Sequence, residues 1–376
     1  MRRMKKKVCH ITSSHGRYDT RIFLKQCKSL VKYGYDVMLL VNDDKEDEIV
    51  DGVKIISTKF KPVSRRERFL NSKKKLFEMA IKIDADIYTF HDPELLLLGY
   101  RLKKAKKVVI FDSHENYPEQ ILIKNYIPIF LRKIVATLYK KIETEVCMRL
   151  DAVLFPNSLN GKHVFERRTR ITEFIENFPL LEEFKYSEYI SDLDKKDTVL
   201  YIGSITEARG ITTLVKSVYM ANAKLILAGK FQSQKYYDEL KELTEYSCVE
   251  YKGVVNRKEV VNIINKSKIG VAIIRNIGQY NKYDGFPTKV YEYMLMGLPV
   301  IISKYDYSYQ VFKENNCGIC VDPENIDEIV KSITFLLNNP EQAKLMGDNG
   351  KRLVKERYNW DLEEKKLVAL YNKLID

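Results

Sequence analysis

The sequence lacks an apolar run long enough to cross a membrane. Its most apolar stretches are residues 95–98 and 121–139, and the longer one is interrupted by three basic residues and a proline. A membrane-spanning helix needs about 18 or more consecutive apolar residues. The basic residues 1–7 are followed by an apolar segment of only residues 8–11, too short for the apolar region of a signal peptide. We therefore expect a cytoplasmic protein, soluble or peripheral on the inner face of the plasma membrane.

The sequence also lacks a disulfide or metal-binding pattern. The six cysteines are scattered, and the one close pair, Cys317 and Cys320, lies where a loop is expected to enter a short strand. Asp84 and Asp86 have the Asp-x-Asp spacing of some metal sites, but they lie between a predicted helix and a predicted buried strand. We expect buried cysteines of a reduced compartment, structural roles for both aspartates, no metal and no cofactor.

Positive charge is concentrated in the first half of the chain. Residues 1–180 hold 36 Lys and Arg against 23 Asp and Glu, whereas residues 181–376 hold 28 of each. Basic clusters lie at residues 59–70, 73–75 and 101–107. Such a surface can bind nucleic acid or anionic lipid, and Phe60, Phe69 and Leu70 are candidates for insertion among lipid tails. A solvated surface of a lysine-rich protein is the alternative.

Short apolar runs alternate with helical stretches along the whole chain. Candidate strands before residue 178 are Val8–Thr12, Val37–Val41, Val53–Ile56, Ile87–Phe90, Val108–Asp112 and Ala152–Pro156. Helices are predicted between them at Thr20–Tyr33, Lys74–Ile83 and Ile129–Arg149. After a polar stretch the strands resume at Val199–Ile202, Lys224–Ala228, Val249–Tyr251, Ile269–Ile273, Pro299–Ile302 and Ile319–Val321. The pattern predicts an α/β protein with two Rossmann-like parallel-sheet domains facing across a cleft.

Residues 284–302 carry the most informative motif. Asp284 and Glu292 flank a Gly-Phe-Pro turn, and the second acid is expected to open a helix that stops at Gly297 before a buried strand. If Pro287 is the first helical residue, the following amides point out of the helix and form an anion site.

The groups around this helix start indicate a particular ligand. The free amides are expected from Thr288, Lys289 and Val290, with the lysine adding a full positive charge. Glu292 adds an acceptor for hydroxyl groups. A phosphate site beside carboxylates that bind hydroxyls indicates a nucleotide sugar.

A second phosphate candidate is the loop from Gly203 to Gly210, which follows a predicted strand and precedes a helix. Its amides can approach phosphate closely, and Arg209 adds charge. His15, His91 and His114 also follow predicted strands. Because ligands gather at the carboxyl ends of parallel strands, we expect all of these groups to face one cleft.

These segments resemble the retaining glycosyltransferases of family 4. The resemblance is carried by Val8–His15, Asp19–Phe23, Gly34–Leu40, His91–Glu94, Phe111–Glu115, Val199–Leu214 and the motif at 284–302. It covers nearly the whole chain in order. The chain departs from the family pattern at four positions: Asp284 replaces glutamate, Pro287 replaces glycine, Ser204 replaces an arginine, and Arg209 replaces a lysine.

The resemblance implies a GT-B architecture. It places an acceptor-binding domain at residues 1–178, a nucleotide-sugar-binding domain at 179–357, and a last helix at 358–376 that crosses back to the first domain. The expected activity is transfer of a sugar, with retention and without metal, from a UDP- or GDP-linked donor to a hydroxyl acceptor. The expected acceptor is a lipid-linked saccharide of polysaccharide or cell-envelope synthesis.

The resemblance also implies site residues. Catalytic roles fall to Asp284 and His114, and donor binding to Gly203, Ser204, Arg209, Gly285, Phe286, Thr288, Lys289 and Glu292. Acceptor binding falls to His15, Asp19, Arg21, His91 and Glu115.

Several alternatives stay open at this point. Asp19 also fits a helix N-cap, both acids of the 284–292 motif fit helix-start acids, and His114 fits a loop anchor. Residues 279–283 are a candidate lid. A nucleotide-sugar epimerase on the same scaffold is an alternative activity. A basic nucleic-acid-binding protein is another, although we expect no nucleic-acid partner because no recognition motif is present.

Overall fold

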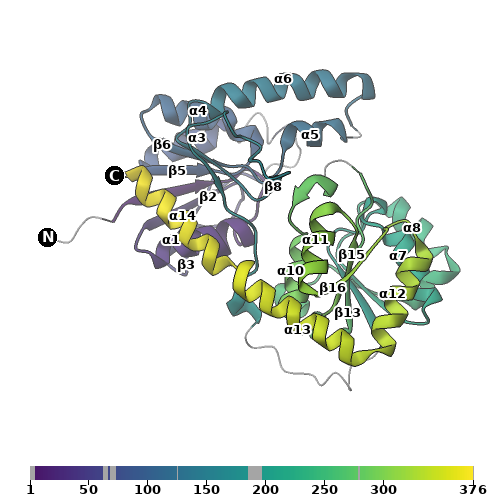
Figure 1. Cartoon of the computed structure of the whole chain (residues 1–376). Coiled ribbons are helices and arrows are strands. Elements are labelled where there is room, and N and C mark those ends of the chain that lie inside the picture. Colours follow the sequence, from purple (N-terminus) through teal and green to yellow (C-terminus); the bar gives the residue numbers. More distant parts are fainter. Residues whose placement is uncertain are drawn as a thin grey trace. The chain divides into compact units, whose positions relative to one another are not determined.

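The computed structural model describes residues 5–61, 67, 73–124, 126–184, 197–277 and 280–375. The chain divides into two compact units, residues 1–177 with 361–376, and residues 178–360. Each unit contains its own sheet with helices on it (Figure 1). The α/β fold class with parallel sheets is confirmed.

The first unit is built on an eight-stranded sheet of order β3-β4-β2-β1-β5-β6-β7-β9. The strands are β1 (Lys7–Ile11), β2 (Asp36–Val41), β3 (Glu48–Val50), β4 (Val53–Ser57), β5 (Ile87–Phe90), β6 (Val108–Asp112), β7 (Ala152–Phe155) and β9 (Thr172–Phe174). Neighbouring strands are parallel except β3 and β4, which form an antiparallel pair at one edge. A further two-residue strand is β8 (Ser158–Leu159). Central strands such as β5 and β7 are buried at every residue, which explains their unbroken apolar runs.

The helices of this unit follow the strands. They are the π-helix η1 (Thr20–Cys27), α1 (Lys28–Lys32), α3 (Lys73–Ile83), the 3₁₀ turn η3 (Pro93–Leu95), α4 (Leu96–Lys104), α5 (Tyr117–Leu122), α6 (Ile129–Cys147) and α14 (Trp360–Ile375). The single helix expected at 20–33 is therefore a π-helix continued by a short α-helix.

Helix α14, at the end of the chain, packs on this first unit. Its Glu364 accepts hydrogen bonds from Ser29 and Lys32 of α1, and Tyr371 bonds to Thr89 of β5. Figure 1 shows α14 running past α1. These contacts bury Tyr371 completely.

The second unit has a six-stranded parallel sheet of order β12-β11-β10-β13-β15-β16. The strands are β10 (Thr198–Ile202), β11 (Lys224–Ala228), β12 (Val249–Gly253), β13 (Ile269–Ala272), β15 (Val300–Ser303) and β16 (Gly318–Val321), with a separate short strand β14 (Tyr283–Asp284). The helices are η4 (Leu181–Phe184), η5 (Glu207–Arg209), α7 (Ile211–Met220), α8 (Gln234–Lys241), η6 (Thr244–Cys248), α9 (Arg257–Asn265), η7 (Tyr280–Lys282), α10 (Thr288–Leu295), α11 (Asp306–Asn315), α12 (Ile326–Asn338) and α13 (Pro340–Arg357).

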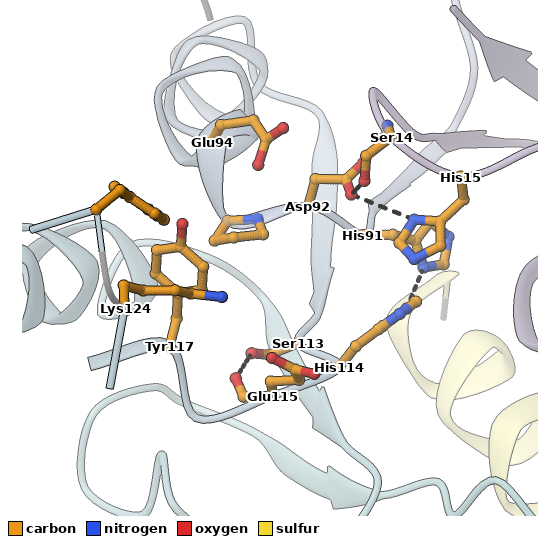
Figure 2. A pocket seen from close by; sticks show the side chains of 12 residues that line it. Ser14, His15, His91, Asp92, Glu94, Ser113, His114, Glu115, Tyr117 and Lys124 are labelled. Atoms are coloured by element: carbon orange, nitrogen blue, oxygen red, sulfur yellow. Dashed lines mark hydrogen bonds and ion pairs between the residues drawn. The ribbon is translucent and has the colours of Figure 1, made fainter. Parts of the chain in front are cut away.

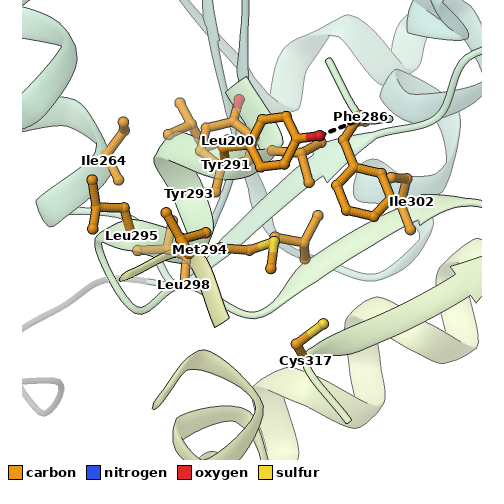
Figure 3. Close-up of a cluster of buried hydrophobic side chains, with 14 of the residues drawn as sticks. Leu200, Ile264, Phe286, Tyr291, Tyr293, Met294, Leu295, Leu298, Ile302 and Cys317 are labelled. Carbon is orange, nitrogen blue, oxygen red and sulfur yellow. Dashed lines mark hydrogen bonds between the residues drawn. The ribbon is translucent and has the colours of Figure 1, made fainter. Parts of the chain in front are cut away.

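Two apolar clusters cover the two faces of this second sheet. Leu200 of β10 belongs to one cluster, and its neighbours Val199 and Tyr201 belong to the other, as the alternation of a strand requires. Figure 3 shows the cluster around α10, into which Tyr293 and Met294 project. The packing is tight enough that a Cβ on Gly270 of β13 would lie 2.3 Å from the Tyr293 ring. Helix α10 is therefore held firmly against the sheet.

The structure also tests the predictions about the cysteines and about Asp84 and Asp86. All six cysteines are unpaired, and four of them, including Cys317, are buried. Asp84 and Asp86 occupy the turn between α3 and β5, where Asp84 pairs with Lys107 and Asp86 accepts the Lys7 amide. Both therefore have structural roles.

Among the described residues, no helix combines the length and the apolar composition that crossing a bilayer requires. Phe69, Leu70 and most of the basic cluster at 59–70 lie outside the described residues.

Candidate functional site

The conformation of the glycine loop after β10 depends on two glycines, Gly203 and Gly229, whose backbones are in contact. Gly203 has φ 130°, and its amide donates to the carbonyl of Ala228 at 2.9 Å. Gly229, at the end of β11, has φ 141°, and a Cβ there would lie 1.8 Å from the Gly203 carbonyl oxygen. Only glycine fits at position 229, because any side chain would displace the loop.

The loop then leads into α7 through a short capped turn. Thr206 accepts the Arg209 amide and caps η5, and Gly210 takes the left-handed conformation at φ 69°. A Cβ on Gly210 would lie 2.2 Å from the carbonyl oxygen of Ile273. The backbone of residues 203–210 is therefore fixed by close packing.

Lys289, the second residue of α10, reaches this loop from a distant part of the sequence. Its Nζ lies 3.5 Å from the centroid of the Tyr201 ring, and a Cβ on Gly203 would be only 3.0 Å from that nitrogen. Glycine at 203 therefore provides both the positive φ and the space for the ammonium group. The sequence-predicted pair of glycine loop and Lys289 is brought together by the structure.

The electrostatics of this site favour an anion. Burial and the positive charge of Arg209 lower the pKa of Lys289 well below its ordinary value, an effect that Glu292 opposes. The Arg209 guanidinium lies 5.1 Å from the centroid of the Tyr280 ring. Within the described part of the chain, no carboxylate lies within ion-pair distance of either cation. Two mutually repelling cations, one in the glycine loop and one at the start of α10, are a suitable site for a diphosphate. The sequence predicted a full positive charge on Lys289. The lowered pKa reduces that charge in the unliganded protein, and a bound anion would restore it.

The start of α10 differs from the expectation in detail. Pro287 is the N-cap residue, with φ −55° and ψ 140°, and the helix begins at Thr288. The Val290 amide donates to the Pro287 carbonyl at 2.8 Å, so it is not a free amide. The expected set of three outward amides was therefore wrong, and Thr288 and Lys289 are the remaining candidates. The Phe286 amide is likewise occupied, because it donates to Tyr291 Oη at 3.0 Å (Figure 3).

Glu292 is held by an arginine that sequence patterns did not identify. It is the fifth residue of α10 and is 5% exposed, so the alternative role of a helix-start acid does not apply. Arg257, at the start of α9, donates from Nη1 to Glu292 Oε1 at 2.8 Å and also pairs with Glu183 of η4. These contacts fix the orientation of the Glu292 carboxylate. Asp284, the other acid of the motif, lies outside the helix at the end of β14.

The other predicted groups come together in the first unit. A cavity of about 350 Å³ lies at the carboxyl ends of β1, β5 and β6 (Figure 2). It is lined by Ser14, His15, His91, Asp92, Pro93, Glu94, Ser113, His114, Glu115, Tyr117, Lys124 and Tyr126. The predicted residues His15, His91, His114 and Glu115 all belong to this lining. The rings of His15 and His114 have centroids 4.8 Å apart, and those of His91 and His114 lie 5.4 Å apart.

Asp112, the last residue of β6, contacts two of the histidines that line the cavity, His91 and His114. Its Oδ2 lies 3.0 Å from His91 Nδ1 and 3.2 Å from His114 Nε2. Arg21 donates to both carboxylate oxygens, at 2.9 and 2.6 Å, and Gln26 donates at 2.7 Å. Burial alone would raise the pKa of Asp112, but the charge of Arg21 and the bonds from both histidines hold it well below its ordinary value.

The histidines differ in their ionisation. Burial lowers the pKa of His91, which favours the neutral ring. Burial also acts to lower the pKa of His15, but the hydrogen bond and charge of Asp92 outweigh burial and raise it. The pKa of Asp92 is lowered because the bonds from His15 and Ser14 outweigh its burial. The cavity therefore combines a neutral imidazole with a protonatable one.

The group of His91, Asp112 and His114 has potential metal-ligand atoms within 4.8 Å of one another. However, the Asp112 carboxylate already accepts the two Arg21 bonds and the Gln26 bond. A divalent cation would have to share that carboxylate with a buried guanidinium charge. This group therefore does not fit a metal site, since a metal ligand needs free electron pairs and tolerates a nearby cation poorly.

Two residues expected to bind acceptor do not line the cavity. Asp19 is the N-cap of η1 and accepts the amides of Arg21 and Ile22, both at 2.9 Å. This confirms the alternative interpretation of Asp19 as a helix cap. Arg21 is 4% exposed and is committed to Asp112 and to the carbonyl of Ile175. We therefore correct its role from binding acceptor to holding Asp112.

Comparison with known proteins agrees with this architecture. The family model described as glycosyl transferases group 1 matches residues 166–353, half of the chain. An uncharacterized glycosyltransferase of Methanocaldococcus jannaschii is 23% identical over 369 residues, covering 92% of this chain and 91% of that protein.

Solved structures show the same fold. Sucrose-phosphate synthase from Thermosynechococcus elongatus superposes with a TM-score of 0.78 at 17% identity, covering 99% of both chains. HepE of Anabaena, solved in complex with UDP and glucose, gives a TM-score of 0.72 at 14% identity, covering 98% of this chain and all of that one. The chain thus belongs to the group 1 glycosyl transferases and has the GT-B fold.

Proposed function

We propose that this glycosyltransferase transfers a sugar from a nucleoside-diphosphate donor to a hydroxyl group of a saccharide acceptor, with retention and without a metal ion. The observation that carries the proposal is the pair Arg209 and Lys289, two cations beside a glycine loop with no carboxylate in ion-pair contact among the described residues. A diphosphate supplies the missing negative charge. The UDP complex of the structural relative HepE supports this choice of donor.

Each residue of the second unit takes a specific part in the proposal. Arg209, Lys289 and the first amides of α10 bind the diphosphate, and Glu292, oriented by Arg257, accepts hydrogen bonds from the ribose hydroxyls. Gly203, Ser204, Gly285, Phe286 and Thr288 form the surrounding donor-binding backbone. Asp284 is assigned to the hydroxyls of the transferred sugar. That assignment and the catalytic role of His114 rest on the family resemblance.

In the proposed reaction, the bond from the anomeric carbon to the donor phosphate oxygen breaks, and a bond to the acceptor oxygen forms on the same face. The acceptor proton passes to the departing phosphate oxygen. The two cations stabilise the negative charge that develops on the diphosphate, as preorganised charges do in other transferases. No bound metal is required for that charge balance.

The acceptor is assigned to the cavity of the first unit. Its lining mixes imidazoles, carboxylates and hydroxyls, which suit a polyhydroxylated ligand. His15, His91 and Glu115 are the acceptor-binding candidates. A saccharide intermediate of polysaccharide or cell-envelope synthesis fits such a lining.

A thermal-shift panel of UDP, GDP, ADP and their sugars tests the proposal, with and without a chelator. A ligand at 100 times its dissociation constant adds about 2.7 kcal/mol of stability, which shifts the melting temperature measurably. We expect one nucleotide series to stabilise the protein equally in chelator. If none of the three diphosphates binds, the proposed function is wrong. NMR of the product's anomeric proton then determines whether configuration is retained.

A further inference from the structure

The solvent-facing side of α6 carries large apolar side chains. Phe130, Ile134, Leu138 and Ile142 are 77%, 56%, 57% and 53% exposed. Their spacing of four residues places them in one stripe along the helix. The buried positions of α6 are Ala136, Glu143, Val146 and Cys147, so the exposed stripe adds to an apolar side that already faces the protein.

The apolar surface continues into the segment before the helix. Ile123, Tyr126 and Ile129 are 42%, 60% and 79% exposed. Helix α5 packs against α6 through rings such as Tyr117 and Tyr139, with centroids 4.9 Å apart. Figure 1 shows α6 as the long helix of this unit, with α4 and α5 labelled beside it. We call residues 123, 124 and 126–142 the α6 surface.

The charges of the α6 surface all have one sign. Residues 120–142 contain no Asp or Glu, whereas they contain Lys124, Arg132, Lys133, Lys140 and Lys141. Glu145, near the end of α6, is the nearest exposed acid on the helix. Between residues 120 and 142 the apolar stripe is accompanied by cations alone, which is complementary to an anionic bilayer whose lipid tails receive the apolar side chains and whose headgroups pair with the cations. A water-exposed face without a partner has no reason to exclude acids.

The α6 surface is continuous with the histidine cavity. Lys124 and Tyr126, directly before α6, belong to the cavity lining. Figure 2 shows Lys124 and Tyr117 at the end of the cavity away from His15 and His114. An acceptor whose lipid anchor lies in the bilayer beside α6 can therefore reach the cavity while its anchor stays in the membrane.

We propose that α6 and the segment before it lie in the interface of an anionic membrane and present the cavity to a lipid-linked acceptor. The role in presenting acceptor rests on the proposed function, whereas binding to lipid does not. This surface differs from the sequence-derived candidates around residues 59–70. It also needs no membrane-spanning helix.

Sedimentation with vesicles tests the proposal, using phosphatidylcholine alone or mixed with phosphatidylglycerol. The full chain should bind the mixed vesicles and not the neutral ones. The double variant Ile134→Gln with Leu138→Gln should bind at least about tenfold more weakly. Lys140→Gln with Lys141→Gln should weaken binding by a similar factor and reduce its dependence on salt concentration, because three of the five cations remain.

Matched controls come from exposed helical positions of the second unit. Met220→Gln with Leu345→Gln replaces two exposed apolar residues, and Lys331→Gln with Lys351→Gln replaces two exposed lysines. Both control variants should bind vesicles like the unmodified chain. Circular dichroism and the UDP, GDP and ADP melting panel verify that every variant is folded and keeps its donor site.

Three outcomes overturn the proposal: no binding to anionic vesicles, equal binding by the α6 variants, or a dimer in analytical ultracentrifugation that the α6 variants dissociate. The last outcome would assign the surface to a second copy of the chain. Vesicle binding without any nucleotide binding would leave the membrane surface standing and remove the proposed transferase activity instead.

Discussion

Replacing Lys289 by methionine should abolish most diphosphate binding while making the unliganded protein more stable. The loss of affinity follows because an interaction between an ammonium and a phosphate contributes about 1.5–3 kcal/mol, or about 10- to 150-fold in the dissociation constant. The gain in stability follows because the Lys289 ammonium is desolvated and repelled by Arg209. Methionine keeps the length of the side chain and its contact with the Tyr201 ring without the charge.

The pH dependence of this stability gain has a definite sign. The pKa of Lys289 is lowered from 10.5 in the folded protein, so the unfolded chain binds the proton more tightly. Stability of the unmodified protein therefore rises with pH between the lowered pKa and 10.5. The advantage of Lys289→Met in melting temperature should be largest below the lowered pKa and shrink as pH rises through that window.

Isothermal titration with the nucleotide identified in the thermal-shift panel measures the first effect, and melting curves at several pH values measure the second. Lys313→Met is the matched control, because Lys313 also lies near an aromatic ring, 5.6 Å from the centroid of Tyr309, on a different helix. Titrations in buffers of different ionisation enthalpy should show proton uptake on binding above the lowered pKa. An unchanged affinity of Lys289→Met for the nucleotide would refute the proposed contact with the diphosphate. A melting temperature of Lys289→Met below that of the unmodified protein would refute the argument about desolvation and repulsion.

Three further predictions concern the framework of the site. Asp112→Asn leaves a buried guanidinium without its counter-charge and should cost about 3–5 kcal/mol in urea denaturation. Gly229→Ala should be far more destabilising than Gly297→Ala in the same assay. Both glycines have positive φ, but a Cβ meets backbone 1.8 Å away at the first and nothing within 4 Å at the second. His15→Gln should destabilise the protein only below the raised pKa of His15, and the loss should disappear as pH rises through it, because protonated His15 pairs with Asp92.

Much of the fold was predictable because its central strands are buried on both faces. The bounds of β5, β6 and β11 agree with the apolar runs seen in the sequence. Strands β3 and β9 were missed, since they are three residues long, partly exposed and without a continuous apolar pattern. Burial on both faces is the physical property that makes a strand visible in sequence.

The site was predictable where its residues are consecutive. The segments at 203–210 and 284–292 carry backbone requirements, glycine and proline above all, that a single sequence displays. Arg257 could not be found in this way, because its importance comes from meeting Glu292 and Glu183, which are distant in sequence. Arg21 was misassigned for the same reason. Sequence shows that an arginine is present but not that it is buried against a carboxylate.

The candidate donor site lies inside the segment that the family model matches, whereas the histidine cavity lies outside it, and chemistry explains this difference. The family model matches residues 166–353, which contain the glycine loop, Lys289 and Glu292. The described residues that line the histidine cavity all lie between 14 and 126, outside that match. A diphosphate is the same in every nucleotide sugar, so one backbone design serves many donors, whereas acceptors differ and need their own side chains. Under the proposed function, substitutions in the cavity and in the α6 surface should therefore change the use of acceptors, and substitutions of Arg209, Lys289 or Glu292 should weaken donor binding.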